Sequence, residues 1–138
     1  MELPPLTSVA MPTKEHWKVE PDAHDYPAAH DYLTLVTDEE RAARLVESLK
    51  SAPLTLRKAK DLLRASSLPA LAQDNVHVAK DLEKVRKGER LSPVLLVRGK
   101  LAPHFPLTVA DGYHRICASY HLDEDADIPC RIVDGPAS

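Results

Sequence analysis

The chain has 138 residues, of which 43% are hydrophobic, and a formal net charge of −3 at pH 7. These values predict one domain with a single core and exclude a protein that binds nucleic acid through its overall charge. Two cysteines, Cys117 and Cys130, make no disulfide framework and favour a reducing compartment. Neither a membrane-spanning run of ~18 apolar residues nor a signal peptide is apparent, so we expect a cytoplasmic protein without a membrane partner.

The N-terminal part of the chain is expected to comprise two segments. Residues 1–22 are rich in proline and aperiodic, which predicts an extended arm; its Trp17 either packs on the domain or belongs to a frayed terminus. Residues 23–55 are predicted to form a helical extension, in which apolar residues recur every three to four positions from Pro27. The second helix begins in TDEERAARLVESLK, where Thr37 and Glu40 have the spacing of a capping box. We interpret the two His-Asp-Tyr triplets, at 24–26 and 30–32, as a loop entering a helix rather than a metal site.

Residues 56–138 are predicted to form a compact α/β unit. Helical spacing covers LRKAKDLLRAS, and a second helix, VHVAKDLEKVRKG, is expected to open at Asp74-Asn75 and stop at Gly88. The run PVLLVR at 93–98 reads as a buried strand, GKLAPHFP as its loop and LTVA at 107–110 as the next strand. A helix over about 113–122 and a strand over 128–133 follow. The expected fold class is therefore α/β (α+β), a small mixed sheet with a helical N-terminal half.

Polar side chains gather in ADGYHRICA, residues 110–118, where the second strand passes into a helix. Gly112 permits a backbone conformation that a Cβ would resist and lets a ligand come close. The first N–H groups of the helix create an anion site, to which His114 and Arg115 can add charge-assisted donors. Two alternatives stay open for Asp111: its carboxylate caps the helix amides, or it faces a ligand, holding a metal ion or accepting a proton.

The order of these segments resembles the ParB/sulfiredoxin-like superfamily. Over residues 56–133, a helix, a glycine, a short linker and the PVLLV strand are followed by PLTVA, DGYHR and, after an acidic gap, IPCRIV. The turn DGYHR is most similar to the Asp-Gly-His-His-Arg of free-serine kinases in this superfamily. Tyr113 stands where sulfiredoxins carry their redox cysteine, so sulfiredoxin chemistry is not expected. Five residues follow the last strand, so the helix-turn-helix domain of partition proteins is not expected either.

The resemblance implies a ParB/sulfiredoxin-like domain, over 56–138, that binds nucleotide phosphates at the turn. A nucleotide (ATP, ADP or CTP), with Mg²⁺ as an option, would lie on Gly112 and the amides of Tyr113 and His114, while His114 and Arg115 neutralise its charge. Asp111 and His114 are the candidate catalytic residues of a small-molecule phosphotransferase or nucleotide hydrolase, in which Asp111 orients Mg²⁺ or acts as base for an acceptor. The further candidate phosphate ligands are Ser92, Arg98 and Lys100.

A non-catalytic alternative also stays open. Six cations and one glutamate lie between positions 84 and 100, a pattern typical of a solvated helix end or of a patch that contacts DNA or another protein. A module of that kind would keep the fold without a reaction, and a homodimer is open in either case. His114, Cys117 and His121 share one helical stripe, as zinc ligands can, but we interpret Cys117 and Cys130 as core residues. No metal site is predicted.

Overall fold

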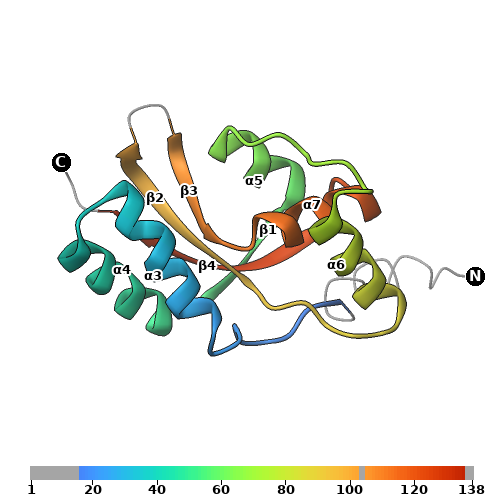
Figure 1. The fold of residues 1–138 in the computed structure, drawn as a ribbon, viewed down its shortest axis with the longest axis horizontal. Coiled ribbons are helices and arrows are strands. Elements are labelled where there is room, and N and C mark those ends of the chain that lie inside the picture. The colour runs from blue at the N-terminus through green and yellow to red at the C-terminus, as the bar shows by residue number, and fades with distance from the viewer. Residues whose placement is uncertain (1–15, 103–104, 136–138) are drawn as a thin grey trace, which may run out of the picture.

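A four-stranded mixed sheet forms the centre of the protein (Figure 1). The computed structural model describes residues 16–102 and 105–135. Strands β2 and β4 run parallel, whereas β1 pairs with β4 and β3 with β2 in antiparallel orientation, giving the order β1-β4-β2-β3. The bounds of the strands are β1 (Leu54–Lys58), β2 (Val94–Ala102), β3 (Phe105–Asp111) and β4 (Asp127–Asp134). The helices within the described residues are α3 (Asp25–Val36), α4 (Glu39–Ser51), α5 (Ala59–Ser66), α6 (Val76–Arg86) and α7 (Tyr113–Leu122).

Strand β2 is buried on both of its faces. Successive side chains of a strand point to opposite sides, and Val94 and Leu96 enter one apolar cluster while Leu95 and Val97 enter another. All four have no exposed surface. A continuously apolar run is what such a doubly covered strand requires, which explains why this segment could be predicted from the sequence.

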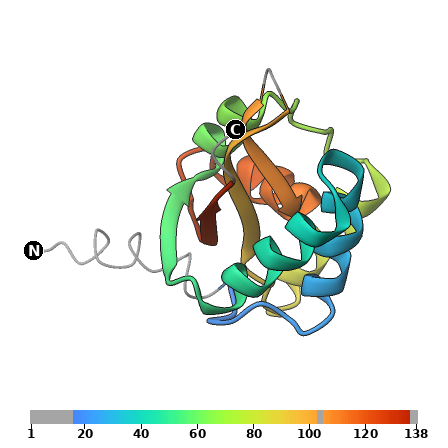
Figure 2. The ribbon, with the colours of Figure 1, turned by 90° about the vertical axis from the view of Figure 1, so that its left-hand side faces the viewer.

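Helices α3 and α4 cover one face of the sheet (Figure 2). Leu33 of α3 and Leu49 of α4 are fully buried against Leu95 and Val97. At the end of α4, the Arg131 guanidinium of β4 donates to the carbonyl oxygens of Leu49 and Lys50. The helical N-terminal half therefore forms a layer on the same sheet as the strands that follow it in sequence.

Helices α5, α6 and α7 lie on the opposite face. Ile116 and Cys117 of α7 are fully buried there, as is Val78 of α6. Trp17, only 4% exposed, joins this cluster, and its backbone forms a parallel bridge with Leu91. Trp17 thus packs on the domain, and the alternative of a frayed terminus at this residue is wrong.

Three sequence expectations are corrected by the structure. Leu54–Lys58, expected to be helical from position 56 on, is the edge strand β1, and α5 begins only at Ala59. The cap of α4 is Asp38, whose Oδ1 accepts from the Arg41 N–H at 2.8 Å, while Thr37 ends α3. The β2–β3 loop is shorter than predicted, since Ala102 already pairs with Phe105; residues 103–104 lie outside the described part.

The elements around the turn agree closely with their predictions. Helix α6 opens at Asn75, whose side chain accepts from the N–H groups of His77 and Val78, and Gly88 follows its end with a φ of 82°. Helix α7 spans the expected residues, and β4 places Ile128 and Cys130 in the same cluster as predicted. These two helices carry the candidate site.

Candidate functional site

The turn between β3 and α7 leaves the start of the helix uncapped. Gly112 has a φ of 113°, and a Cβ built on it would lie 2.5 Å from Cγ1 of Val94, so both conformation and space require glycine. No side chain caps α7. Because the first N–H groups of a helix have no partner within it, the amides of Tyr113 and His114 are available to an anion.

Asp111 does not cap the helix. Its Oδ2 accepts from the Arg115 guanidinium at 2.9 Å instead, so the capping interpretation is wrong. Burial raises the pKa of Asp111, an effect that Arg115 opposes and the nearby carboxylate of Asp25 reinforces. The carboxyl group therefore stands beside the helix amides without occupying them.

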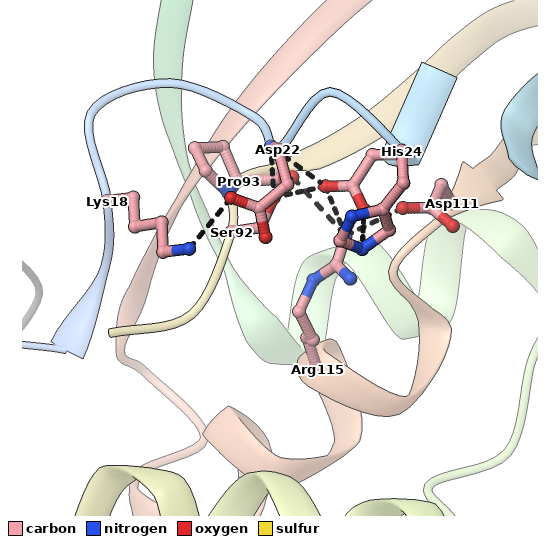
Figure 3. A network of polar contacts seen from close by, with 8 residues as sticks. Lys18, Asp22, His24, Ser92, Pro93, Asp111 and Arg115 are labelled. Atoms are coloured by element: carbon pink, nitrogen blue, oxygen red, sulfur yellow. Dashed lines mark hydrogen bonds and ion pairs between the residues drawn. The ribbon is translucent and has the colours of Figure 1, made fainter. Parts of the chain in front are cut away.

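Arg115 is the centre of a polar network beneath the turn (Figure 3). Besides Asp111, its guanidinium nitrogen lies 3.4 Å from the Pro93 carbonyl and 3.7 Å from the carboxylate of Asp25. Asp25 is itself 2% exposed and accepts a hydrogen bond from the Ser92 hydroxyl. Arg115 thus holds buried carboxylates, whereas the sequence predicted that it would neutralise phosphate.

A cleft of about 330 Å³ lies in front of the turn. Its walls come from the N-terminal turn of α7 and from one face of α6, where positions spaced three and four apart lie side by side. The lining residues are His77, Lys80, Asp81, Lys84, Asp111, Gly112, Tyr113, His114 and Arg115. Five consecutive residues predicted from the turn, 111–115, are therefore brought together at one cleft.

The lysines of the cleft differ from the other cations of α6. Arg86, the last residue of α6, and Lys87, which follows it, both pair with Glu83 and do not line the cleft. Lys80 and Lys84 form no ion pair with any residue that the structure describes. Asp81 lies between them in sequence, and burial raises its pKa, against the lowering influence of Lys84 and Arg115. The cleft therefore offers two unpaired ammonium groups to an anion.

Two imidazole rings meet at the mouth of the cleft. The ring centroids of His77 and His114 are 4.6 Å apart. Burial lowers the pKa of His114, and His77 adds to this effect while Asp81 opposes it. The neutral form of His114 is therefore favoured at neutral pH, and it can act as a hydrogen-bond donor or proton acceptor to a ligand oxygen.

Tyr113 anchors the loop beside the cleft. Its hydroxyl donates to the carbonyl of Pro69 at 2.6 Å, and the ring packs partly against the core cluster around α7. Its ring centroid lies 5.6 Å from that of His114. Tyr113 thereby connects the loop after α5 to the turn and packs against the core.

Of the three further residues predicted as phosphate ligands, the two whose side chains are described, Ser92 and Arg98, are not brought to the cleft lining. Ser92 is buried and bound to Asp25 behind the turn. Arg98 lies further along β2, opposite Leu107, and pairs with Asp134 at 2.9 Å. The side chain of Lys100 lies outside the described residues. Because β2 and β3 are antiparallel, residues later in β2 move away from the end of β3 that carries Asp111, and for this reason Arg98 does not reach the turn.

The three residues of α7 that share one helical stripe, as zinc ligands can, do not come together as a metal site. Cys117 is fully buried and its Sγ accepts from the Leu71 N–H, while His121 contacts the Leu71 carbonyl at 2.5 Å. The expectation that Cys117 and Cys130 are core residues is confirmed, and burial raises the pKa of the Cys130 thiol to about 12. His114 faces the cleft instead.

One group in the described part of the chain has the ligand spacing of a metal site, namely Asp22, His24 and Asp25. Two of its members already bind cations: Asp22 pairs with Lys18 at 2.7 Å and Asp25 lies 3.7 Å from Arg115. Lys18 holds the pKa of Asp22 below its usual range. These contacts describe a charge network rather than a vacant ligand set.

Several site residues were missed by sequence reasoning. His77, Lys80, Asp81 and Lys84 recur at helical spacing on α6. This signal was present but was not used, and only Lys84 was counted among the cations interpreted as a solvated helix end or a contact patch. Asp25 belongs to the His-Asp-Tyr repeat and carried no signal that could pair it with Arg115.

Within the described ranges, no helix is both long and apolar enough to cross a membrane. No protein-family model, curated protein or solved structure matches this chain.

Proposed function

We propose that this protein binds the phosphate groups of a nucleotide in the cleft between α6 and α7. The observation that carries the proposal is the meeting of an uncapped helix start with two unpaired lysines, Lys80 and Lys84, in one cleft of about 330 Å³. Helix amides and ammonium groups are complementary to phosphate oxygens. The resemblance of the DGYHR turn to the ParB/sulfiredoxin-like superfamily supports the same ligand class.

The phosphate chain would lie along α6. One phosphate group accepts hydrogen bonds from the Tyr113 and His114 amides, where Gly112 lets it approach the backbone closely. The next groups meet Lys80 and Lys84, which are four residues and therefore ~6 Å apart along the helix axis. This length suits a di- or triphosphate better than a monophosphate, so ATP, ADP or CTP should bind more tightly than the corresponding monophosphates.

Magnesium would enter with the phosphates. Asp81 and Asp111 are the carboxylates that line the cleft, and oxygen ligands of this kind suit Mg²⁺, which is usually held by one or two carboxylates together with substrate phosphates. If phosphoryl transfer to a small acceptor or to water occurs here, Asp111 is the group placed to accept the proton, and His114 is placed to donate a hydrogen bond to the phosphoryl oxygens.

Thermal shift with ATP, ADP and CTP, each with and without Mg²⁺, tests the proposal. Ligand at ~100 times its Kd stabilises the folded state by about 2.7 kcal/mol, an increase in Tm of several degrees for a chain of this size. The Lys80→Gln/Lys84→Gln variant should lose this increase. Lys87→Gln, which removes a cation that pairs with Glu83 and does not line the cleft, should retain it.

Two results would contradict nucleotide binding. One is an absence of any Tm increase at millimolar nucleotide; the other is equal binding by the wild type and the Lys80→Gln/Lys84→Gln variant. The non-catalytic alternative predicts instead a strongly salt-dependent interaction with duplex DNA or a protein, lost in a variant with Lys84, Arg86 and Lys87 replaced. The pairing of Arg86 and Lys87 with Glu83 argues against it.

A further inference from the structure

The cleft between α6 and α7 is lined mainly by charged and polar groups. Among the residues that the structure describes, none of those lining it has an aliphatic side chain. Ammonium, carboxylate, guanidinium and imidazole groups surround Gly112 and the Tyr113 ring. Pockets for small molecules are usually lined predominantly by hydrophobic and aromatic side chains, with a few polar groups that orient the ligand. This cleft has the reverse composition, which suits a ligand that is charged along its whole length.

The aromatic rings of the cleft are too close together to hold a base between them. The ring centroids of His77 and His114 are 4.6 Å apart, and those of Tyr113 and His114 are 5.6 Å apart. Stacked bases are spaced by ~3.4 Å, so a base held between two rings needs ~7 Å between these rings. Neither pair of rings therefore forms a sandwich for a nucleobase in this structure.

The apolar hollows of the described surface are separate from the cleft. One lies between α3, α5 and β3 and is lined by Tyr32 and Leu107, and another is lined by Leu82 of α6 and Leu122 of α7. Neither hollow shares a lining residue with the cleft. Val76, in the first turn of α6, is 71% exposed but does not line the cleft either. An apolar contact to a base would therefore have to form outside the cleft.

We propose that the cleft recognises a chain of phosphate groups and not the nucleoside attached to it, so that its ligands are phosphoanhydrides in general, whether nucleotide or inorganic. The Tyr113 and His114 amides and the ammonium groups of Lys80 and Lys84 are all complementary to phosphate oxygens. The position of the phosphates rests on the proposed function, and the inference adds the class of compound that the site selects.

Calorimetric titration of the full chain with ATP, CTP and methyl triphosphate, at equal Mg²⁺, tests this selectivity. Methyl triphosphate keeps the triphosphate group but lacks ribose and base. Stacking of one base increases affinity roughly 5- to 150-fold. We therefore expect ATP and CTP to bind within about fivefold of each other, and no more than about fivefold more tightly than methyl triphosphate. A larger advantage of either nucleotide, or binding of adenosine, would overturn the proposal.

His77→Ala examines the exposed ring of α6 directly. If this ring stacks on the base, the variant loses affinity for ATP but not for methyl triphosphate, and that selective loss would overturn the proposal. The expected result is an unchanged ratio of the two Kd values, because both compounds present the same phosphate chain. His30→Ala, on α3 and outside the cleft lining, is the matched control and should leave both Kd values unchanged.

The same titrations separate this inference from nucleotide binding. If ATP and CTP bind but methyl triphosphate does not, the inference fails and nucleotide binding stands. If methyl triphosphate binds but neither nucleotide does, nucleotide binding fails and recognition of the phosphate chain stands. If none of the three binds, both fail. The Lys80→Gln/Lys84→Gln variant should lose all three, and methyl triphosphate binding that survives in it would overturn the inference.

Discussion

Arg115 shows at the residue scale how one side chain can support both structure and site. It was predicted as a phosphate ligand, yet its guanidinium is bound to Asp111 and lies beside Asp25. Arg115→Met would leave two carboxylates without their cation in a desolvated place, and breaking a buried pair in this way costs about 3–5 kcal/mol. Urea denaturation at neutral pH measures this loss.

The Asp111→Asn/Arg115→Met double variant is the control for that prediction. It removes one carboxylate together with the cation, so it should recover part of the stability that Arg115→Met loses. A loss below about 1 kcal/mol for Arg115→Met would place the pair with exposed ion pairs, and would contradict its buried structural role.

Gly112 gives the second prediction at this scale. Alanine there would need a φ of 113° and would place its Cβ 2.5 Å from Val94. Strained φ values of this kind cost about 1–3 kcal/mol, and the turn would also shift the amides that face the cleft. Gly112→Ala should therefore lower both Tm and the affinity for ATP.

Gly88→Ala separates the two effects at Gly112. Gly88 has a φ of 82°, but nothing lies within 4 Å of a Cβ built there. Its substitution should cost stability through backbone strain alone and leave ATP binding intact. Equal losses of affinity in the two variants would contradict a specific role for the turn.

Sequence reasoning at the residue scale found the residues that are contiguous and missed those that are distant. Positions 111–115 were identified because their spacing at a strand–helix junction has a direct geometric meaning. Asp25 is 67 positions from its partner Ser92, and no local pattern encodes a contact of that separation. The orientation of Asp111 was undecided between the helix amides and a ligand, and its observed partner, Arg115, lies only four positions away in the sequence.

At the scale of elements, helix α6 forms one wall of the cleft, and its start depends on Asn75. The Asn75 side chain accepts from the His77 N–H at 3.0 Å and the Val78 N–H at 3.2 Å. Asn75→Ala should cost about 1 kcal/mol and weaken ATP binding, because the first turn of α6 carries His77. Asn75→Asp should retain most of the stability. Thermal unfolding and calorimetric titration provide the two measurements.

Strand β1 explains where element prediction from the sequence failed. Its segment LTLRK has the burial pattern of an exposed edge strand, with Leu56 58% exposed. Leu56 also fits the helical spacing of Leu62 and Leu63, so periodicity favoured one long helix. Pairing with β4 determines the strand, and that partner lies more than 60 residues later in the sequence. The elements α6, α7 and β4 were predicted correctly because caps, glycines and alternation specify them locally.

At the scale of the whole molecule, the layer of α3 and α4 contributes to the site through Asp25. Leu33 anchors this layer and has no exposed surface. Leu33→Ala should lower the free energy of unfolding by about 2–5 kcal/mol. Leu35→Ala on the same helix, where the side chain is 81% exposed, should stay within about 0.5 kcal/mol of the wild type. Chemical denaturation of both variants checks the assignment of this face to the core.

The last prediction concerns pH and charge. The whole chain carries a net charge of −3, so an anionic ligand depends on the local charge of the cleft. Burial raises the pKa values of Asp81 and Asp111 and lowers that of His114. Without ligand, the carboxyl pKa values of Asp81 and Asp111 are higher in the folded state than the 3.8 of the unfolded state. The stability that these two groups contribute is therefore fully present below pH 3.8 and is lost as the pH rises through their folded-state pKa values. The pKa of His114 is lower in the folded state than the 6.5 of the unfolded state. The stability that His114 contributes is therefore present above pH 6.5 and is lost as the pH falls through its folded-state pKa.

Protonation of each of these three groups changes the affinity for an anionic ligand in the same direction. Protonation of Asp81, Asp111 or His114 adds positive charge to the cleft, so the affinity for ATP should increase as pH falls from alkaline to mildly acidic values. Asp81→Asn removes one of the three groups and should increase the affinity for Mg²⁺-free ATP at high pH while flattening the profile. Because the phosphates of ATP titrate equally in both experiments, the difference between wild-type and variant profiles isolates the protein. Calorimetric titration across this range provides the measurement, and parallel profiles would show that Asp81 does not act on the ligand.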